Sequence, residues 1–236
     1  MSPRRQVIGV LGGMGPAATV HFLQALLDAT PAERDQDHLR VLVDNNPTVP
    51  DRNAALAGQG PSPGPVLAEM ARGLERSGAD FLVMPCNTAH AFQAEVEAAV
   101  SIPLLGIIDV TADAVLSSRR GLGAVGLLAA PGALRAGLYQ DAFTARGVRT
   151  IAPEGALHER MAGLLYRVKA GDTGADARRE MAAIAGALVG AGAEVLASAC
   201  TEVPLVLSAG DAPATLVDST AALARAAVDR ATRGEA

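Results

Sequence analysis

Short apolar runs alternate with stretches of helical periodicity along most of the chain. The strands predicted from these runs cover residues 6–11, 40–44, 101–108, 122–128 and 147–151. The predicted helices cover residues 89–100 and 156–169, an alanine-rich stretch after residues 216–220, and a first helix from Pro16 that carries Val20, Leu23 and Leu27 at helical spacing. Strands that alternate with helices are typical of an α/β fold with mainly parallel sheets.

The pattern repeats itself in two stretches that hold the only two cysteines, Cys86 and Cys200. Each stretch has an apolar helical pattern, then Gly-Ala-acid, then an apolar run that leads to the cysteine. Every matched pair is separated by 114 positions (200 − 86 = 114). The pairs are Leu67 and Met181, Met70 and Ile184, Leu74 and Leu188, Gly78 and Gly192, Ala79 and Ala193, Asp80 and Glu194, and Leu82 and Leu196. A gap-free repeat of this length predicts two similar halves, whose cysteines face each other across one cleft.

Composition narrows the class of protein further. A chain of 236 residues suits one large domain or two small ones, and its 50% hydrophobic content provides a sizeable core. Aromatic residues are only 3% of the chain, so alanine, leucine and valine must fill that core. The net charge of −5 argues against a nucleic-acid surface, although an anionic small molecule responds to local charge instead.

Several other classes are disfavoured. Two cysteines without a CxxC motif or a Cys/His cluster do not make a zinc site, and we expect no metal. A disulfide between them is an open alternative, but nothing indicates secretion, because the apolar run after Arg5 is too short for a signal peptide and is broken by Gly12-Gly13. No stretch approaches the roughly 20 apolar residues of a membrane span. We therefore expect a cytoplasmic protein without a membrane partner.

Both thiols are predicted at the carboxyl ends of parallel strands, where open sheets bind ligands. Each precedes a predicted helix, and a helix N-terminus lowers the pKa of a thiol below its usual value of about 8.5. The neighbours Asn87, Thr88 and Thr201 can donate hydrogen bonds to a thiolate or a substrate. The alternative for a single cysteine is a small buried hydrophobe, but the duplication makes packing a weaker explanation for both.

A symmetric pair of thiols suits the inversion of a stereocentre. One thiolate removes the α-proton while the opposite thiol delivers a proton to the other face, and the roles exchange for the other enantiomer. No cofactor is required if donors and cations around the carboxylate stabilise the carbanion.

Two loops offer polar groups for a ligand. Residues 12–16 form a glycine loop ahead of a helix, which can hold a phosphate or a carboxylate, but the spacing is neither GxGxxG nor GxxxxGK[ST]. Residues 45–53 follow the second strand and contain Arg52, which is either a bidentate carboxylate ligand or a solvated loop arginine. Residues 57–65 form a Gly/Pro-rich connector that could cover a site nearby.

These segments together resemble the cofactor-independent aspartate/glutamate racemases, most closely the aspartate racemase branch. The resemblance covers nearly the whole chain in the family's order. Its motifs are Gly12-Gly13-Met14-Gly15-Pro16-Ala17-Ala18-Thr19, Asp44-Asn45-Asn46-Pro47 with Pro50-Asp51-Arg52, Pro85-Cys86-Asn87-Thr88-Ala89-His90, Cys200-Thr201-Glu202-Val203-Pro204-Leu205-Val206-Leu207 and Asp218-Ser219-Thr220.

The resemblance implies two α/β domains related by a pseudo-two-fold axis, with the active site in the cleft between them. It implies domains at residues 1–107 plus 214–236 and at residues 108–213, Cys86 and Cys200 as the acid/base pair, no PLP and no metal. Residues implied at the substrate site are Met14, Thr48, Arg52, Asn87, Thr88, Lys169 and Thr201. Arg52 and Lys169, the only lysine, would hold the carboxylates of an acidic amino acid, and a homodimer is expected.

Other residues and activities remain open. His90 could tune Cys86 or make a structural hydrogen bond, and Glu202 could orient Cys200 or begin a helix. Relatives tend to carry threonines at the positions of Ala130 and Ala133, whose hydroxyls would face the ligand, so a neutral substrate such as homoserine is an alternative to an acidic one. A cis-trans isomerase similar to the maleate isomerases, with one nucleophilic cysteine, and a binding protein with inert thiols are further alternatives.

Overall fold

The computed structural model describes residues 5–233 and divides the chain into two compact units. The first unit contains the chain up to Ile107 and again from Thr220 onward, and the second contains Ile108–Ser219. Residues 214–219, which we expected in the first domain, belong to the second, because the strand that they contain pairs within the second sheet. The return to the first unit therefore comes at residue 220.

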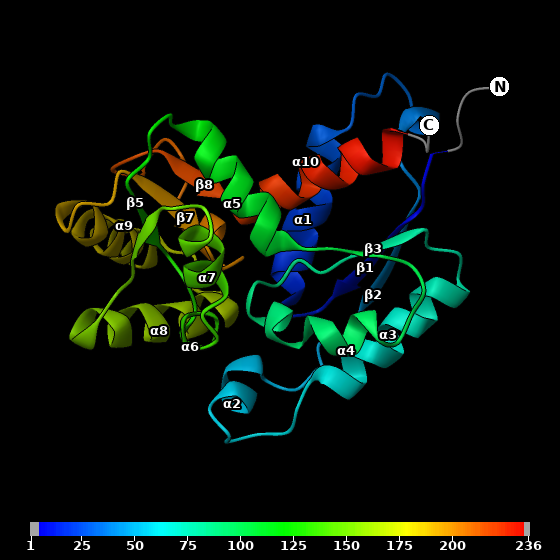
Figure 1. Ribbon diagram of the computed structural model, residues 1–236, viewed down its shortest axis with the longest axis horizontal. Helices are drawn as coiled ribbons and strands as arrows, with labels where there is room; N and C mark the ends of the chain where they lie inside the picture. The colour runs from blue at the N-terminus through cyan, green and yellow to red at the C-terminus, as the bar shows by residue number, and fades with distance from the viewer. Residues whose placement is uncertain (1–4, 234–236) are drawn as a thin grey trace. The chain divides into compact units, whose positions relative to one another are not determined.

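The first unit is a four-stranded parallel sheet with helices on its faces (Figure 1). Its strand order is β2-β1-β3-β4. The elements are β1 (Ile8–Gly12), α1 (Pro16–Ala29), a 3₁₀ helix (Asp35–Asp37), β2 (Val41–Asn45), α2 (Arg52–Leu56), α3 (Gly64–Arg76), β3 (Phe81–Val83), a 3₁₀ helix (Thr88–Phe92), α4 (Gln93–Glu97), β4 (Leu104–Leu105) and α10 (Ser219–Thr232). Figure 1 shows α1 and α10 on the opposite side of this sheet from α3 and α4.

The second unit repeats this topology with the strand order β6-β5-β7-β8, again all parallel. Its elements are α5 (Ile107–Ser118), β5 (Ala124–Leu127), α6 (Pro131–Arg135), α7 (Leu138–Thr144), β6 (Arg149–Ile151), α8 (Gly155–Lys169), α9 (Ala175–Gly190), β7 (Val195–Ser198), a 3₁₀ helix (Val203–Leu205) and β8 (Leu216–Asp218). Side chains of β7 alternate between two cores, because Leu196 packs with α8 and α9 while Val195 and Ala197 pack with α5 and α7. The predicted α/β class with two similar parallel sheets is confirmed.

The sequence repeat has a direct structural counterpart. A Cβ atom on Gly9 would lie 2.8 Å from Leu82 Cδ2 and 2.9 Å from Ala79 Cβ. A Cβ atom on Gly126 would lie 2.7 Å from Leu196 Cδ2 and 3.0 Å from Ala193 Cβ, the repeat partners of the same two residues. Each central strand therefore needs glycine where the helix-to-strand turn packs against it.

The paired acids of the repeat, Asp80 and Glu194, make equivalent hydrogen bonds in the two units. The Asp80 carboxylate accepts a hydrogen bond from the Val7 N–H at 2.6 Å, and the Glu194 carboxylate accepts one from the Gly123 N–H at 3.1 Å. In both units a carboxylate thus ties the turn before the third strand to the start of the first strand of that unit. This explains why the repeat keeps an acid at this position.

Some predicted elements differ from the structure. The helix predicted over residues 89–100 is interrupted, with a 3₁₀ helix before the short α4, and the strand predicted over residues 101–108 shrinks to β4 because α5 begins at Ile107. The apolar face expected on α1 points outward, with Val20 67% and Leu27 51% exposed. Thr19 faces the sheet instead, because its Oγ1 accepts a hydrogen bond from the Gly13 N–H at 2.9 Å.

Candidate active site

Cys86 follows β3 at the carboxyl edge of the first sheet. Its side chain is 6% exposed and belongs to the apolar cluster that contains Met14, Met84 and Ala89. The Cys86 N–H donates to the Met84 carbonyl at 2.7 Å, which makes a tight turn directly after the strand. The next residue, Asn87, is buried as well. This turn brings one thiol and an amide to the edge where parallel sheets bind ligands.

His90 holds this turn in place through both ring nitrogens. Nδ1 lies 2.9 Å from the Cys86 carbonyl oxygen, and the Ile107 N–H donates to Nε2 at 3.1 Å. A carbonyl only accepts and an N–H only donates, so these partners require the neutral tautomer with the proton on Nδ1. His90 is also buried. Its contacts therefore support the structural alternative over a direct role in proton transfer.

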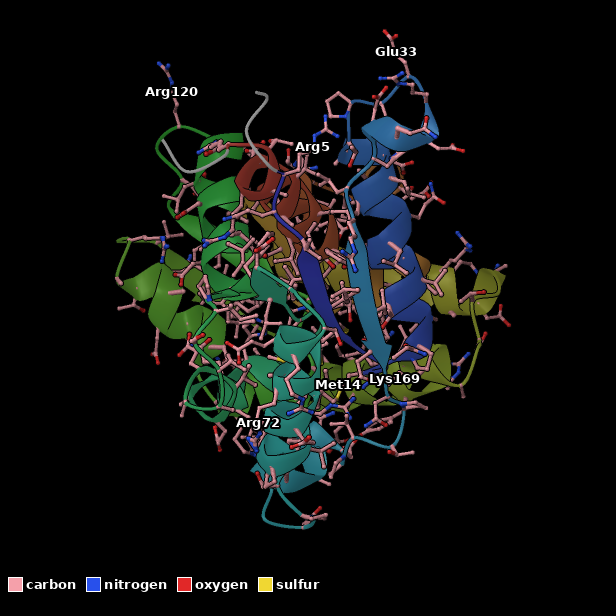
Figure 2. The ribbon with its side chains drawn as sticks, turned by 90° about the vertical axis from the view of Figure 1, so that its right-hand side faces the viewer. Arg5, Met14, Glu33, Arg72, Arg120 and Lys169 are labelled. Atoms are coloured by element: carbon pink, nitrogen blue, oxygen red, sulfur yellow. The ribbon has the colours of Figure 1, made fainter. Side chains whose placement is uncertain are left out.

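The glycine loop and the loop after β2 end at the same edge as Cys86. Figure 2 labels Arg5, which precedes β1, and Met14, which follows its carboxyl end and is buried there. Thr48 is exposed, and its Oγ1 donates to Asn46 Oδ1 at 2.6 Å. Gly13 lies so close to Asn46 that a Cβ atom would overlap its backbone at 2.3 Å, and its φ of +92° also favours glycine.

Arg52 is buried at the first residue of α2 and is not a solvated loop arginine. Its Nη1 donates to the carbonyl oxygens of Val49 and Pro50, at 3.2 and 3.0 Å. These bonds orient the guanidinium, whose planar fork has five N–H donors in total. Two of its donors at most serve these carbonyls, so the fork retains the capacity to bind an anion.

Cys200 occupies the equivalent position in the second unit, after β7. Its side chain is 5% exposed and belongs to the apolar cluster of Leu128, Ala130 and Val168. Its thiol donates to Glu202 Oε2 at 2.9 Å. The Thr201 hydroxyl donates to the same oxygen at 3.4 Å.

The two thiols therefore have different neighbours. Glu202 stands two residues after Cys200, whereas Thr88 stands two residues after Cys86. The position two residues after the cysteine thus holds a buried carboxylate bonded to the thiol in the second unit and a buried threonine in the first.

Burial raises the pKa of the Cys200 thiol well above its usual value, and the negative charge of Glu202 raises that pKa further, while Lys169 lowers it. We expected a lowered pKa from a following helix, and for Cys200 this expectation is wrong. The element after it is a 3₁₀ helix of three residues, Val203–Leu205, which has almost no dipole to offer. Cys200 is therefore held as a neutral thiol.

Lys169 lies in the last turn of α8 and is exposed (Figure 2). Its Nζ lies 5.6 Å from the centroid of the Tyr166 ring, one helical turn earlier. The positive charge of Lys169 favours the thiolate of Cys200 and lowers the pKa of that thiol, against the larger effects of burial and of Glu202. The second unit thus combines a thiol, a buried carboxylate and an exposed cation.

The predicted site residues gather in two groups, one in each unit. At the carboxyl edge of the first sheet lie Met14, Thr48, Arg52, Asn87 and Thr88 with Cys86, and in the second unit Lys169, Thr201 and Glu202 accompany Cys200. Both cysteines are free thiols. Within residues 5–233 no group of three or more His, Cys, Asp or Glu side chains could hold a metal ion.

No sequence motif pointed to Tyr139, a fully buried residue of α7 within electrostatic reach of Cys200. Its hydroxyl is hydrogen-bonded to the side chains of Thr111 and Ser219, and burial raises its pKa well above the usual value for a tyrosine. Helix α7 was not predicted, so no pattern placed this phenol near a thiol. The one feature of the sequence that could have drawn attention to Tyr139 is that tyrosine is rare in this chain, which has only two.

Comparison with known proteins identifies relatives of this chain. A broad specificity amino-acid racemase, RacX, from Bacillus subtilis is 31% identical over 109 residues, which are 44% of this chain and 47% of that protein. A glutamate racemase from Deinococcus radiodurans is 33% identical over 162 residues, 64% of this chain and 53% of that protein. The chain thus spans about half the length of the curated relatives that it matches.

Among solved structures, the aspartate racemase of Picrophilus torridus is similar with a TM-score of 0.87 and 32% identity, over 96% of this chain and 94% of that one. No helix in the described part of the chain is long and apolar enough to cross a membrane. The family model for Asp/Glu/hydantoin racemases matches residues 11–227, and the resemblance seen in the sequence is thereby confirmed: the chain belongs to the Asp/Glu/hydantoin racemase family.

Proposed function

We propose that this chain is a PLP-independent amino-acid racemase that inverts the α-carbon through a two-base mechanism with Cys86 and Cys200. One observation carries the proposal. Each unit has a buried free thiol at the equivalent place, directly after β3 in the first unit and directly after β7 in the second. Packing alone gives no reason to keep a sulfur at both positions.

In the proposed cycle the two sulfurs reach opposite faces of one α-carbon. The Glu202 contact holds Cys200 as a thiol, so in the resting enzyme Cys200 is the proton donor and Cys86 is the base. The Cys86 thiolate takes the α-proton, and Cys200 delivers its own proton to the other face. After one turnover Cys86 carries a proton and Cys200 is a thiolate, which is the form that accepts the opposite enantiomer.

We propose an acidic amino acid as the substrate. Arg52, buried and oriented by two carbonyls, and Lys169, exposed at the end of α8, are cations on the two units that suit two carboxylates. The Asn87 amide and the hydroxyls of Thr88 and Thr201 supply donors to the carbanion and its carboxylate. The proposal assigns no cofactor and no metal to the reaction.

A second candidate is a racemase for a neutral amino acid such as homoserine. Ala130 packs in the same apolar cluster as Cys200, and Ala133 is buried nearby in the sequence, so methyl groups stand at the two positions where threonine hydroxyls were expected. The broad specificity named for the Bacillus subtilis relative is consistent with this alternative. The homodimer and the cytoplasmic location expected from the sequence stay predictions.

Incubation of L- and D-amino acids in D₂O, followed by NMR and chiral chromatography, tests the function and the substrate together. We expect deuterium at Cα and inversion with aspartate or glutamate. Inversion of homoserine alone would support the neutral alternative. Isomerisation of maleate without exchange at an amino-acid Cα would replace the racemase with a cis-trans isomerase, and no turnover with alkylation of neither thiol would indicate a binding protein.

Single-thiol variants test the mechanism. Cys86→Ala and Cys200→Ala should each lower inversion by roughly a hundredfold to ten-thousandfold, the usual contribution of a general acid or base, while circular dichroism shows a folded chain. A lone thiol can return a proton only to the face from which it came. Each variant should therefore exchange deuterium into one enantiomer without inversion. Inversion at the wild-type rate in either variant would remove the two-base mechanism.

A further inference from the structure

The chain passes between its two units at two places only within residues 5–233. It leaves the first unit at Ile107, the first residue of α5, and returns after Ser219, the first residue of α10. Both connections are therefore the first turns of helices. The side chains of Ile107, Thr111 and Ser219 are fully buried there.

Tyr139 joins these two connections inside the second unit. Its hydroxyl is hydrogen-bonded to the side chains of Thr111, in α5, and of Ser219. A phenol has one proton, so at least one of the two serine and threonine hydroxyls donates to it. The Tyr139 ring is stacked on that of Phe143, with 6.2 Å between the centroids, and only 1% of the residue is exposed. Water cannot replace the phenol without opening this core.

Each connection is also bonded to the turn of a cysteine. On the first connection, the Ile107 N–H donates to His90, whose other ring nitrogen donates to the Cys86 carbonyl. On the second, Ser219 follows Asp218, which is paired in β8 with Ser198 of β7, and the Ser198 hydroxyl donates to the Cys200 carbonyl at 3.1 Å.

We propose that Tyr139 is a positioning residue, whose hydroxyl ties α5 to the first residue of α10 inside the second unit and so holds the ends of the two connections there. Its contribution to catalysis rests on the proposed function, because a shift of about 1 Å at a reacting group can lower a rate by about a hundredfold. The tie between the connections rests on the contacts alone. Tyr139 does not itself touch the reacting atoms in this proposal.

The test compares Tyr139→Phe with Phe143→Leu in the full chain. Tyr139→Phe keeps the ring and removes the two hydrogen bonds, whereas Phe143→Leu loosens the same core from the same helix without changing a hydroxyl. Hydrogen exchange with mass spectrometry reads the amides of residues 107–112 and 218–222. We expect Tyr139→Phe to speed exchange in both segments by about tenfold relative to the amides of β7, and Phe143→Leu to leave this ratio unchanged.

Kinetics provides the second readout. Tyr139→Phe should lower kcat by about tenfold or more with KM changed little, which is the pattern of lost transition-state geometry. Thr111→Val removes the hydroxyl that bonds to Tyr139 and keeps a side chain of nearly the same size. This variant replaces Tyr139→Phe in the test if Tyr139→Phe does not fold. Unchanged exchange in the two segments, or an equal rise in Phe143→Leu, overturns the inference. Faster exchange in a chain with no racemase activity would retain the tie and reject the proposed function.

Discussion

His90→Leu is the sharpest test of how the Cys86 turn is held. Leucine fills the space of the imidazole but removes its two buried hydrogen bonds, to the Cys86 carbonyl and from the Ile107 N–H. The loss of each buried hydrogen bond costs about 1–3 kcal/mol, so the free energy of unfolding should fall by about 2–6 kcal/mol. At about 2–4 °C per kcal/mol in a chain of this size, the middle of that range lowers the melting temperature by roughly 8–16 °C.

The assay is thermal unfolding by circular dichroism and calorimetry, with His90→Gln as the matched control. Glutamine offers one N–H donor group and one oxygen acceptor, so it should recover part of the loss. A His90→Leu protein that melts like the wild type would show that the two hydrogen bonds contribute nothing. If that protein also lost turnover, His90 would be a proton-transfer group and our assignment of its tautomer would be irrelevant to its role.

Three further predictions address the site and the repeat. Lys169→Ala should raise KM for a dicarboxylic amino acid by about tenfold to a hundredfold, the effect of losing one charge-assisted hydrogen bond, with steady-state kinetics on both enantiomers as the measurement; an unchanged KM would end its anchoring role. The Glu202 charge raises the pKa of the Cys200 thiol, so Glu202→Gln should lower that pKa and speed alkylation of Cys200 by iodoacetamide near neutral pH. Peptide mass spectrometry measures the alkylation, with Cys86 as the internal reference, and equal or slower alkylation of Cys200 would contradict the prediction. Gly126→Ala should destabilise the chain by about 1–3 kcal/mol through overlap with Leu196, whereas Gly163→Ala in α8, with nothing near its Cβ position, should stabilise it by about 0.5–1 kcal/mol, both read by denaturant unfolding.

The sequence predicted the architecture well where its pattern repeats. The apolar residues of the repeat, such as Leu74 and Leu188, are buried at equivalent places, and the acids Asp80 and Glu194 make equivalent bonds. Periodicity failed on α1, because its two candidate faces are both apolar. The buried face carries Phe22 and Leu26 together with Thr19, which accepts a hydrogen bond from the Gly13 N–H.

The sequence indicated which residues belong to the site better than it indicated their chemical environment. Motifs indicated both cysteines, but the environment of Cys200 depends on the direction of the Glu202 side chain, which turns back to the sulfur and does not cap a helix. Helices α6 and α7 escaped prediction because they have only five and seven residues, too few to show a helical period. The network of Tyr139 joins residues from three separate helices, so no local spacing could indicate it.

The carboxylate that accepts a hydrogen bond from the Cys200 thiol has a thermodynamic consequence for a racemase. Two enantiomers have equal free energies in water, so the Haldane relation requires kcat/KM to be the same for both at every pH. Whatever preference Glu202 gives for a proton on Cys200 must therefore change kcat and KM by the same factor and in the same direction when the two enantiomers are compared. An unequal pair of bases can make one enantiomer bind more tightly and react more slowly, yet it cannot move the final mixture away from equal amounts.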